Sequence, residues 1–226
     1  MTRAARLAEL HRAEARAMDL LAAIEAHQFI QPGRTEREVE QDIKALALAE
    51  FGIEKHWHKR ICRTGANAKC TARDNPPVLT IADDDLVYLD LGPVIGDWEA
   101  DVGRSYVVGN DPEKHRLVDD LAKGFDALRD AYRADPDATG VQLYQFATDW
   151  AEARNWTFGG VIAGHVIDEF PHAHLPGEKD WFRINAANDT RLRDPHQNGT
   201  DRFWIGEIHL VSRDSRFAGF YEQLLD

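Results

Sequence analysis

Cysteine is scarce in this chain, and so is positive charge. Only two of the 226 residues are cysteines, Cys62 and Cys70, and their spacing forms neither a CxxC pair nor a zinc knuckle. We therefore expect free thiols in a reducing compartment, with a single disulfide as the alternative. The 39 acidic residues outnumber the 27 lysines and arginines, which gives a formal net charge of −12. Because general nucleic-acid binding requires cationic side chains that neutralise phosphates, this balance argues against a nucleic-acid partner.

Long apolar runs are absent as well. No stretch approaches the roughly 20 apolar residues that a membrane-spanning helix needs, and no apolar segment follows Met1 as in a secretory signal. The hydrophobic content of 43% and the charged content of 29% are ordinary for a globular protein. The sequence thus predicts a cytoplasmic protein with no membrane partner. We expect one domain over residues 1–226, with 1–34 as an N-terminal helical segment and no separate N-terminal domain.

Helical and β-type patterns alternate along the chain. Apolar residues at helical spacing predict a first helix within 3–28, and Thr35 opens a capping-box pattern for a second helix that ends near Gly52. Further helices are expected over about 112–134 and 139–155, strands over 57–64, 86–91, 98–108, 156–167, 202–210 and 217–225, and irregular loops over 65–77 and 171–200. Each half of the chain therefore carries two helices and then a β-hairpin.

Four acidic residues interrupt the apolar runs of these two hairpins. If the first turn centres on Ile95-Gly96, Asp90 lies opposite Asp101. An equivalent turn in the second hairpin places Glu207 opposite Glu222. Side chains that face each other across two strands are about 4.5–5.5 Å apart, so ionised pairs there would repel and lose hydration. Each acid alone can be a turn cap or a solvated residue, but the pairing of all four favours divalent metal ions between them.

Two histidines precede the second hairpin. His165 directly follows Gly164 in a strand-like segment and is the candidate for a further metal ligand, although a lone histidine in a strand is more often a core residue. His172 follows seven residues later, where a surface position is the alternative interpretation. Both histidines therefore belong to the candidate site.

In this order and context, the residues resemble those of the pita-bread metallopeptidases, which comprise methionine aminopeptidase, Xaa-Pro aminopeptidase and prolidase, with creatinase as a relative that works without metal. The resemblance covers about residues 35–226 and rests on Asp90 in LDLG, Asp101 in ADVGRSY, His165 in AGH, Glu207 in WIGEIHL and Glu222 in GFYEQLL. It implies an α/β (α+β) fold of duplicated helix-helix-hairpin halves around a curved, mainly antiparallel sheet. It also implies that these five residues hold two divalent ions of Mn, Co, Fe or Zn.

The same resemblance implies a metal-dependent aminopeptidase- or dipeptidase-like hydrolase, whose substrate is a peptide or small amide cleaved near a free N-terminus. Glu207 would serve as metal ligand and as general base on water, and His172 would donate a hydrogen bond to the developing oxyanion. Two features depart from the family. The segment 170–174 reads Phe-Pro-His-Ala-His in place of a histidine followed by an acid, and 65–77 lacks the further substrate-binding histidine.

Two alternatives stay open at this point. One is a binding or scaffold protein that keeps the fold without peptidase activity, which the altered segment around His172 favours. The other is a creatinase-like amidinohydrolase that works without metal, which the full set of metal ligands disfavours. The sequence is compatible with a homodimer.

Overall fold

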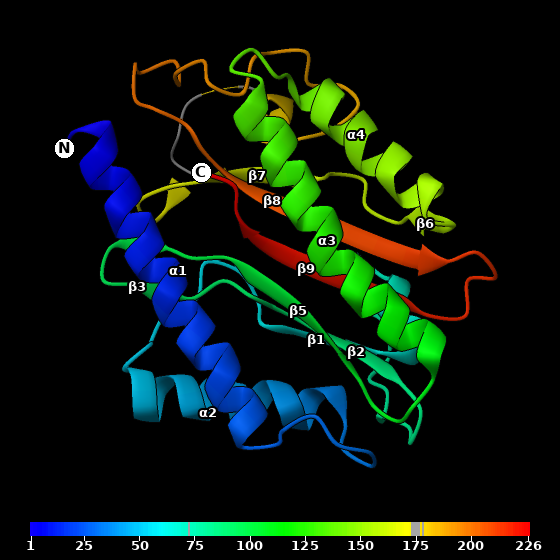
Figure 1. Ribbon diagram of the computed structural model, residues 1–226. Helices are drawn as coiled ribbons and strands as arrows, with labels where there is room; N and C mark the ends of the chain where they lie inside the picture. The colour runs from blue at the N-terminus through cyan, green and yellow to red at the C-terminus, as the bar shows by residue number, and fades with distance from the viewer. Residues whose placement is uncertain (72, 173–176, 178) are drawn as a thin grey trace.

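The computed structural model describes residues 1–71, 73–172, 177 and 179–226, and its centre is a seven-stranded sheet (Figure 1). The strand order is β1 (Ile61–Thr64), β2 (Leu86–Leu91), β5 (Val102–Val107), β9 (Ala218–Leu224), β8 (Phe203–Ser212) and β6 (Trp156–Phe158), and β7 (Gly164–Ile167) also pairs with β8. The paired strands run antiparallel. The expected α/β class with a mainly antiparallel sheet is therefore confirmed.

Four long helices accompany the sheet, two in each half of the chain. They are α1 (Arg3–Ala26), α2 (Glu36–Phe51), α3 (Pro112–Ala134) and α4 (Gly140–Ala153). In Figure 1, α1 and α3 cross the near face of the sheet and α2 lies beside α1. The predicted capping box is present at the start of α2, where the Thr35 Oγ1 accepts a hydrogen bond from the Glu38 N–H and the Glu38 carboxylate accepts one from the Thr35 N–H.

Alternation along the strands decides which side chains face the helices. Leu89 and Leu91 belong to the hydrophobic core beneath α1 and α2, so Asp90 between them faces the opposite side of the sheet. In the second half, Ile208 and Leu210 belong to the core beneath α3 and α4. The helices thus cover one face of the sheet, and the opposite face is free to carry a polar site.

The first hairpin differs from the prediction in its register. Asp90 pairs with Gly103 and not with Asp101. The cause is the position of the turn, which is centred on Gly96-Asp97, one residue later than predicted. The short ribbon of β3 (Val94–Ile95) and β4 (Trp98–Glu99) continues the register of the main ladder, so each partner moves by two residues. A shift of two residues keeps each side chain on its face of the sheet, whereas a shift of one would reverse it. In the second hairpin, Glu207 pairs with Glu222 as predicted.

Three predicted strands are shorter or divided. Residues 57–60 leave the first strand because the Trp57 N–H bonds to the Gly92 carbonyl and its indole N–H bonds to the Ala100 carbonyl. The segment 98–108 is divided into β4 and β5, and 156–167 is divided at Gly159-Gly160 into β6 and β7. The segment 65–77, expected to be irregular, begins with the 3₁₀ helix η1 (Gly65–Lys69).

The prediction of a surface loop over 171–200 is wrong for its second part. A 3₁₀ helix, η3 (Lys179–Phe182), is followed by the buried residues Ile184, Asn185, Asn188, Leu192 and His196. Backbone hydrogen bonds tie this segment to the start of α4, including one from the Val141 N–H to the Asn188 carbonyl at 2.7 Å. Residues 173–176 and 178, which include the altered Ala173-His174 pattern, lie outside the described residues.

Cys62 and Cys70 are both free thiols, as expected from their spacing. Cys62 is buried under α2, and burial raises the pKa of its thiol. Among the described residues, no helix is long and apolar enough to span a membrane.

Acid should destabilise the protein through His196, whose side chain is only 2% exposed. Its two ring nitrogens have no hydrogen-bond partner among the described residues, and burial, together with the charge of Arg202, lowers its pKa from 6.5 to about 4. The unfolded chain therefore binds this proton more readily, so stability is lost as the pH falls from 6.5 toward 4. We expect the melting temperature of His196→Phe to fall less than that of the wild type as the pH is lowered through this window. The exposed His115→Phe is the control, and parallel curves for all three proteins would contradict the assignment.

Candidate metal centre

The five acidic and histidine residues selected from the sequence as metal ligands meet on the sheet face opposite the helices. They come from β2 (Asp90), the residue before β5 (Asp101), β7 (His165), β8 (Glu207) and β9 (Glu222). The His165 Nε2 lies 3.0 Å from the Asp101 Oδ2, 3.2 Å from the Glu222 Oε1 and 3.8 Å from the Glu207 Oε1. Neighbouring ligands of one ion are about 3.0–3.4 Å apart when metal–ligand bonds are about 2.0–2.1 Å long. The two shorter separations fit that spacing.

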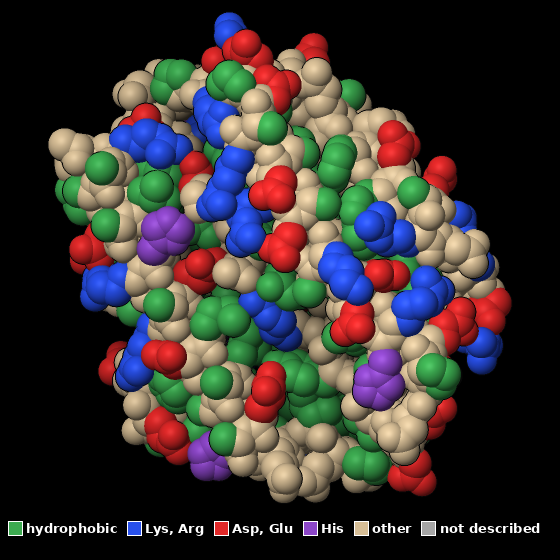
Figure 2. Space-filling view, viewed as in Figure 1, with side chains coloured by type: hydrophobic (Ala, Val, Ile, Leu, Met, Phe, Trp, Pro, Cys, Tyr) green, Lys and Arg blue, Asp and Glu red, His purple; other side chains and the backbone are tan. Residues whose placement is uncertain are grey.

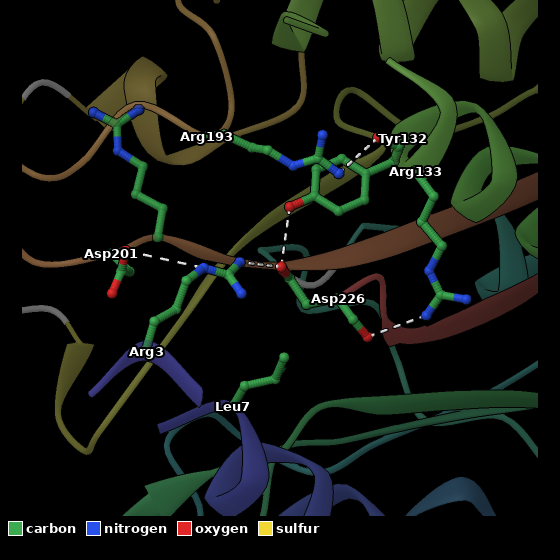
Figure 3. A pocket seen from close by; sticks show the side chains of 8 residues that line it. Arg3, Leu7, Tyr132, Arg133, Arg193, Asp201 and Asp226 are labelled. Carbon is green, nitrogen blue, oxygen red and sulfur yellow. Dashed lines mark hydrogen bonds and ion pairs between the residues drawn. The ribbon is translucent and has the colours of Figure 1, made fainter. Parts of the chain in front are cut away.

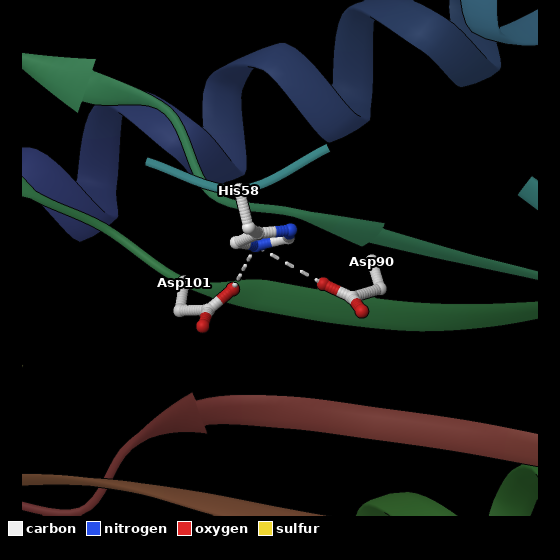
Figure 4. A group of neighbouring side chains, drawn as sticks. All are labelled: His58, Asp90 and Asp101. Atoms are coloured by element: carbon white, nitrogen blue, oxygen red, sulfur yellow. Dashed lines mark hydrogen bonds and ion pairs between the residues drawn. The ribbon is translucent and has the colours of Figure 1, made fainter. Parts of the chain in front are cut away.

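A further histidine, His58, joins the cluster on the side of Asp90 (Figure 4). Its Nε2 lies 3.3 Å from the Asp90 Oδ1 and 3.1 Å from the Asp101 Oδ1. The sequence analysis missed it, because a further histidine was sought only in 65–77. Strand pairing could have found it: Ile61 lies opposite Asp90 in an antiparallel ladder, so residues that precede Ile61 continue past the end of β2.

The side chains form two groups that share one carboxylate. His58, Asp90 and Asp101 form the first, and Asp101, His165 and Glu222 form the second; within each group the possible ligand atoms lie within 4.8 Å of one another. The Asp101 Oδ1 faces His58 and its Oδ2 faces His165. A carboxylate placed in this way can bridge two neighbouring cations.

Burial and charge in the cluster suit cations of this kind. Burial and the nearby acids raise the pKa of Glu207 to about 8 and that of Glu222 well above its usual value, although His165 opposes both shifts. Burial likewise raises the pKa of Asp90 to about 6. For Asp101, the cost of burial is outweighed by His58 and by hydrogen bonds with both histidines, so its pKa falls to about 2. Four carboxylates in one buried cluster thus resist joint ionisation, and divalent cations would relieve this. Oxygen donors with imidazole nitrogen fit hard to borderline divalent ions.

The fold fixes the orientation of His165. Gly164 has a φ of +147°, and a Cβ at this position would lie 2.1 Å from the Ile205 carbonyl oxygen. Only glycine therefore allows β7 to approach β8 so closely. The His165 Nδ1 lies 2.8 Å from the Val166 carbonyl oxygen. Because a carbonyl only accepts, Nδ1 carries the proton, and in the neutral ring Nε2 turns an unprotonated nitrogen to the acids.

His172 lies beside the cluster and outside both ligand groups. Its ring is stacked with that of His165, with 6.3 Å between centroids. The buried Glu99 holds it, because the Glu99 carboxylate accepts a hydrogen bond from the His172 N–H at 3.0 Å and contacts the His172 Nδ1. Trp57 packs edge-on against His58, His165 and His172, with centroid distances of 4.4, 5.4 and 4.9 Å. The sequence analysis missed Glu99 and Trp57, which give no motif of their own.

A separate hollow lies near the two chain ends, between Arg3, Tyr132 and Asp226 (Figure 3). Its lining includes an ion pair and a hydrogen bond: Arg3 and Asp226 are 2.7 Å apart, and the Tyr132 hydroxyl donates to Asp226 at 3.1 Å. Figure 2 shows basic and acidic side chains mixed over the helix-covered face of the molecule. The hollow contains no residue of the metal cluster, and we interpret it as a structural contact of the chain ends.

Comparison with known proteins agrees with this architecture. The chain is similar to the X-Pro aminopeptidase of Thermotoga maritima MSB8 (TM-score 0.76, 16% identity, 99% of this chain and 61% of that chain). It is also similar to the prolidase of Pyrococcus furiosus (TM-score 0.74, 19% identity, 99% of this chain and 60% of that chain). A third similar structure is the methionine aminopeptidase of Rickettsia prowazekii (TM-score 0.69, 15% identity, 96% of this chain and 91% of that chain). These likenesses confirm the expected pita-bread fold.

Sequence comparison extends this agreement from fold to family. A curated protein of Mycoplasma pneumoniae, named as a Xaa-Pro aminopeptidase, is 29% identical over 121 residues, which is 54% of this chain and 32% of the relative. The match thus spans about a third of that relative's length. The model of metallopeptidase family M24 matches residues 6–194, which is most of the chain. The chain therefore belongs to metallopeptidase family M24.

Proposed function

We propose that this protein is an aminopeptidase- or dipeptidase-like hydrolase that uses two divalent metal ions to cleave a peptide or small amide near a free N-terminus. The observation that carries the proposal is the pair of ligand groups joined by Asp101, one carboxylate oxygen toward each. The names of its relatives, which include prolidase, Xaa-Pro aminopeptidase and methionine aminopeptidase, support a peptide substrate.

The ligands divide between two positions. Asp90 and Asp101 would hold one ion, and Asp101, His165, Glu207 and Glu222 would surround the other. Mn, Co, Fe and Zn are all compatible with carboxylate oxygens and imidazole nitrogen. When bound, such a pair supplies a Lewis acid and lowers the pKa of water toward neutrality.

The side chains around the ions would carry the proton transfer. Glu207 lies at the edge of the cluster and is less buried than Glu222, with side chains 14% and 3% exposed. A carboxylate at the edge of the ion position can accept a proton from water held there. We propose Glu207 as the general base. His172, oriented by Glu99 through its Nδ1, would present its other ring nitrogen to the substrate oxygen.

Metal content tests the proposal directly. Protein stripped with chelator and reconstituted separately with Mn, Co, Fe or Zn should bind close to two ions per chain with at least one of them, as measured by elemental analysis. The same sample should hydrolyse some Xaa-Pro or methionyl dipeptides and amides, and chelator should stop it. No bound metal after any reconstitution would refute the proposal. Two bound ions without hydrolysis would favour the scaffold alternative, and hydrolysis that resists chelator would favour the creatinase-like one.

A further inference from the structure

We propose that His58 is a sixth protein ligand of the metal centre and completes the ion position at Asp90. The resemblance to the family implies five ligands, and His58 is not among them. This inference rests on the proposed two-metal function and adds a donor atom to it.

The His58 imidazole lies at the distance from two acids that a shared ion requires. The His58 Nε2 is close to one carboxylate oxygen from each of two acids, at 3.3 Å from Asp90 and 3.1 Å from Asp101. Both separations lie in the range of about 3.0–3.4 Å expected between neighbouring ligands of one ion. His165 has the same relation to Asp101 and Glu222, at 3.0 and 3.2 Å. The two groups are therefore alike: each has two acids and one imidazole.

The unprotonated nitrogen of the neutral His58 ring, Nε2, points to the two acids. The His58 Nδ1 lies 2.7 Å from the carbonyl oxygen of the next residue, Lys59, and must donate its proton there. His165 makes the same contact with its own next residue, Val166, at 2.8 Å. Histidines that bind metals usually donate their other ring N–H to a carbonyl or carboxylate in this way, which fixes the tautomer and the ring. In its neutral form, His58 thus presents an unprotonated Nε2 to the two acids.

The absence of a side chain at Gly92 leaves space for the His58 ring. A Cβ on Gly92 would lie 2.2 Å from the His58 Cδ2 and 2.3 Å from its Nε2. Trp57 also packs edge-on against this ring, with 4.4 Å between ring centroids, and its indole lies against Gly92 as well. The His58 side chain is only 19% exposed. The imidazole is therefore packed against both the Gly92 backbone and the indole and is not free in solvent.

A sixth ligand changes the chemistry of the Asp90 position. Without His58, that position has only carboxylate oxygens, which suit hard ions such as Mn. A neutral imidazole adds a nitrogen donor without adding negative charge to an already crowded acidic cluster. Each ion would then have one nitrogen ligand, and the preference of the Asp90 position would shift toward Co, Fe and Zn, as His165 already provides at the other position.

The test is metal titration of chelator-stripped protein with Co(II) and Zn(II), followed by calorimetry and by X-ray absorption of the bound metal. We expect the wild type to bind two ions with an average of one imidazole per ion. His58→Ala should bind one ion with unchanged affinity and the other at least about tenfold more weakly, the lower end of the effect of disturbing a metal's surroundings. Its imidazole signal per chain should fall by half.

Three further variants guard against trivial outcomes. His58→Gln keeps side-chain bulk and hydrogen bonding, so it should fold if His58→Ala does not, and it should show the same weakening. Gly92→Ala keeps the imidazole but displaces it, together with the Trp57 indole that also lies against Gly92, and it should weaken the same ion. His56→Gln changes the same segment at a histidine outside both ligand groups and should bind as the wild type does.

The outcomes separate the two proposals. Two ions bound with wild-type affinity and an unchanged imidazole signal in His58→Ala or His58→Gln would overturn the assignment of His58 and leave the proposed function intact. No metal bound by the wild type would overturn both. Weakening in His56→Gln equal to that in the His58 variants would also overturn it, because the effect would then be one of segment folding.

Discussion

Asp101→Asn is expected to abolish the effect of metal on the stability of this protein. Asp101 is the one carboxylate that belongs to both ligand groups, so its loss affects both ion positions at once. A ligand that binds only the folded state stabilises it by about 4 kcal/mol when its concentration is about a thousand times its dissociation constant. We expect the metal-loaded wild type to lose stability of this order on addition of EDTA, and the variant to be less stable than the loaded wild type and indifferent to EDTA.

Thermal melts of both proteins with and without EDTA provide the measurement. Asp97→Asn is the matched control, because Asp97 is an exposed acid in the same hairpin. It should keep the wild-type response to chelator. If the cluster holds no metal, Asp101→Asn loses its contacts with His58 and His165 and should still be destabilised, but EDTA should then change the melting of none of the proteins. Melting that ignores chelator in every protein would therefore contradict the metal site.

Glu207→Gln is expected to reduce turnover by about 10²–10⁴-fold, the usual contribution of a general base, while the fold is kept. The amide has the shape of the carboxylate, but it cannot accept a proton from water. Measurement requires kcat on a substrate found in the peptide screen, together with circular dichroism and metal content. Metal content separates the two roles of this residue, since a variant that keeps two ions but not turnover has lost the base alone. Turnover near that of the wild type would rule out Glu207 as the base.

Glu169→Gln is the control for the Glu207→Gln experiment. Glu169 is exposed and lies outside both ligand groups. Glu169→Gln makes the same chemical change at a position between His165 and His172 in the sequence. It should retain wild-type turnover and metal content.

The hairpin acids were predictable from the sequence because alternation is a local property. The assumed turn gave the wrong partner for Asp90, since the turn is centred on Gly96-Asp97, one residue later, and this moves each partner by two. The face of the sheet was still correct, because side chains repeat every second residue. For Glu207 and Glu222, the simple turn was correct and so was the register.

The residues that support the cluster were not predictable in the same way. His58 meets Asp101 across 43 positions of sequence, and Glu99 meets His172 across 73. Such contacts depend on how distant strands and loops pack, so His58 becomes predictable only once the pairing of β1 with β2 is known, and Glu99 has no such signal. The buried part of 171–200 was missed for a related reason. Its polar composition suggested exposure, whereas Asn188 bonds to Val141 at the start of α4 and Leu192 bonds to Ala138 just before it.

The meeting of β5 and β9 at the middle of the sheet has a consequence for how the protein assembles. The pairing joins Gly103 to Glu222, more than a hundred positions later, and a Cβ on Gly103 would lie 2.6 Å from the Phe220 ring. The cluster takes three residues from the chain before β5, namely His58, Asp90 and Asp101, and three from the chain after β5, namely His165, Glu207 and Glu222. Contacts between such distant segments form slowly in folding. Because Glu222 lies in β9, the cluster stays incomplete during synthesis until β9 has left the ribosome.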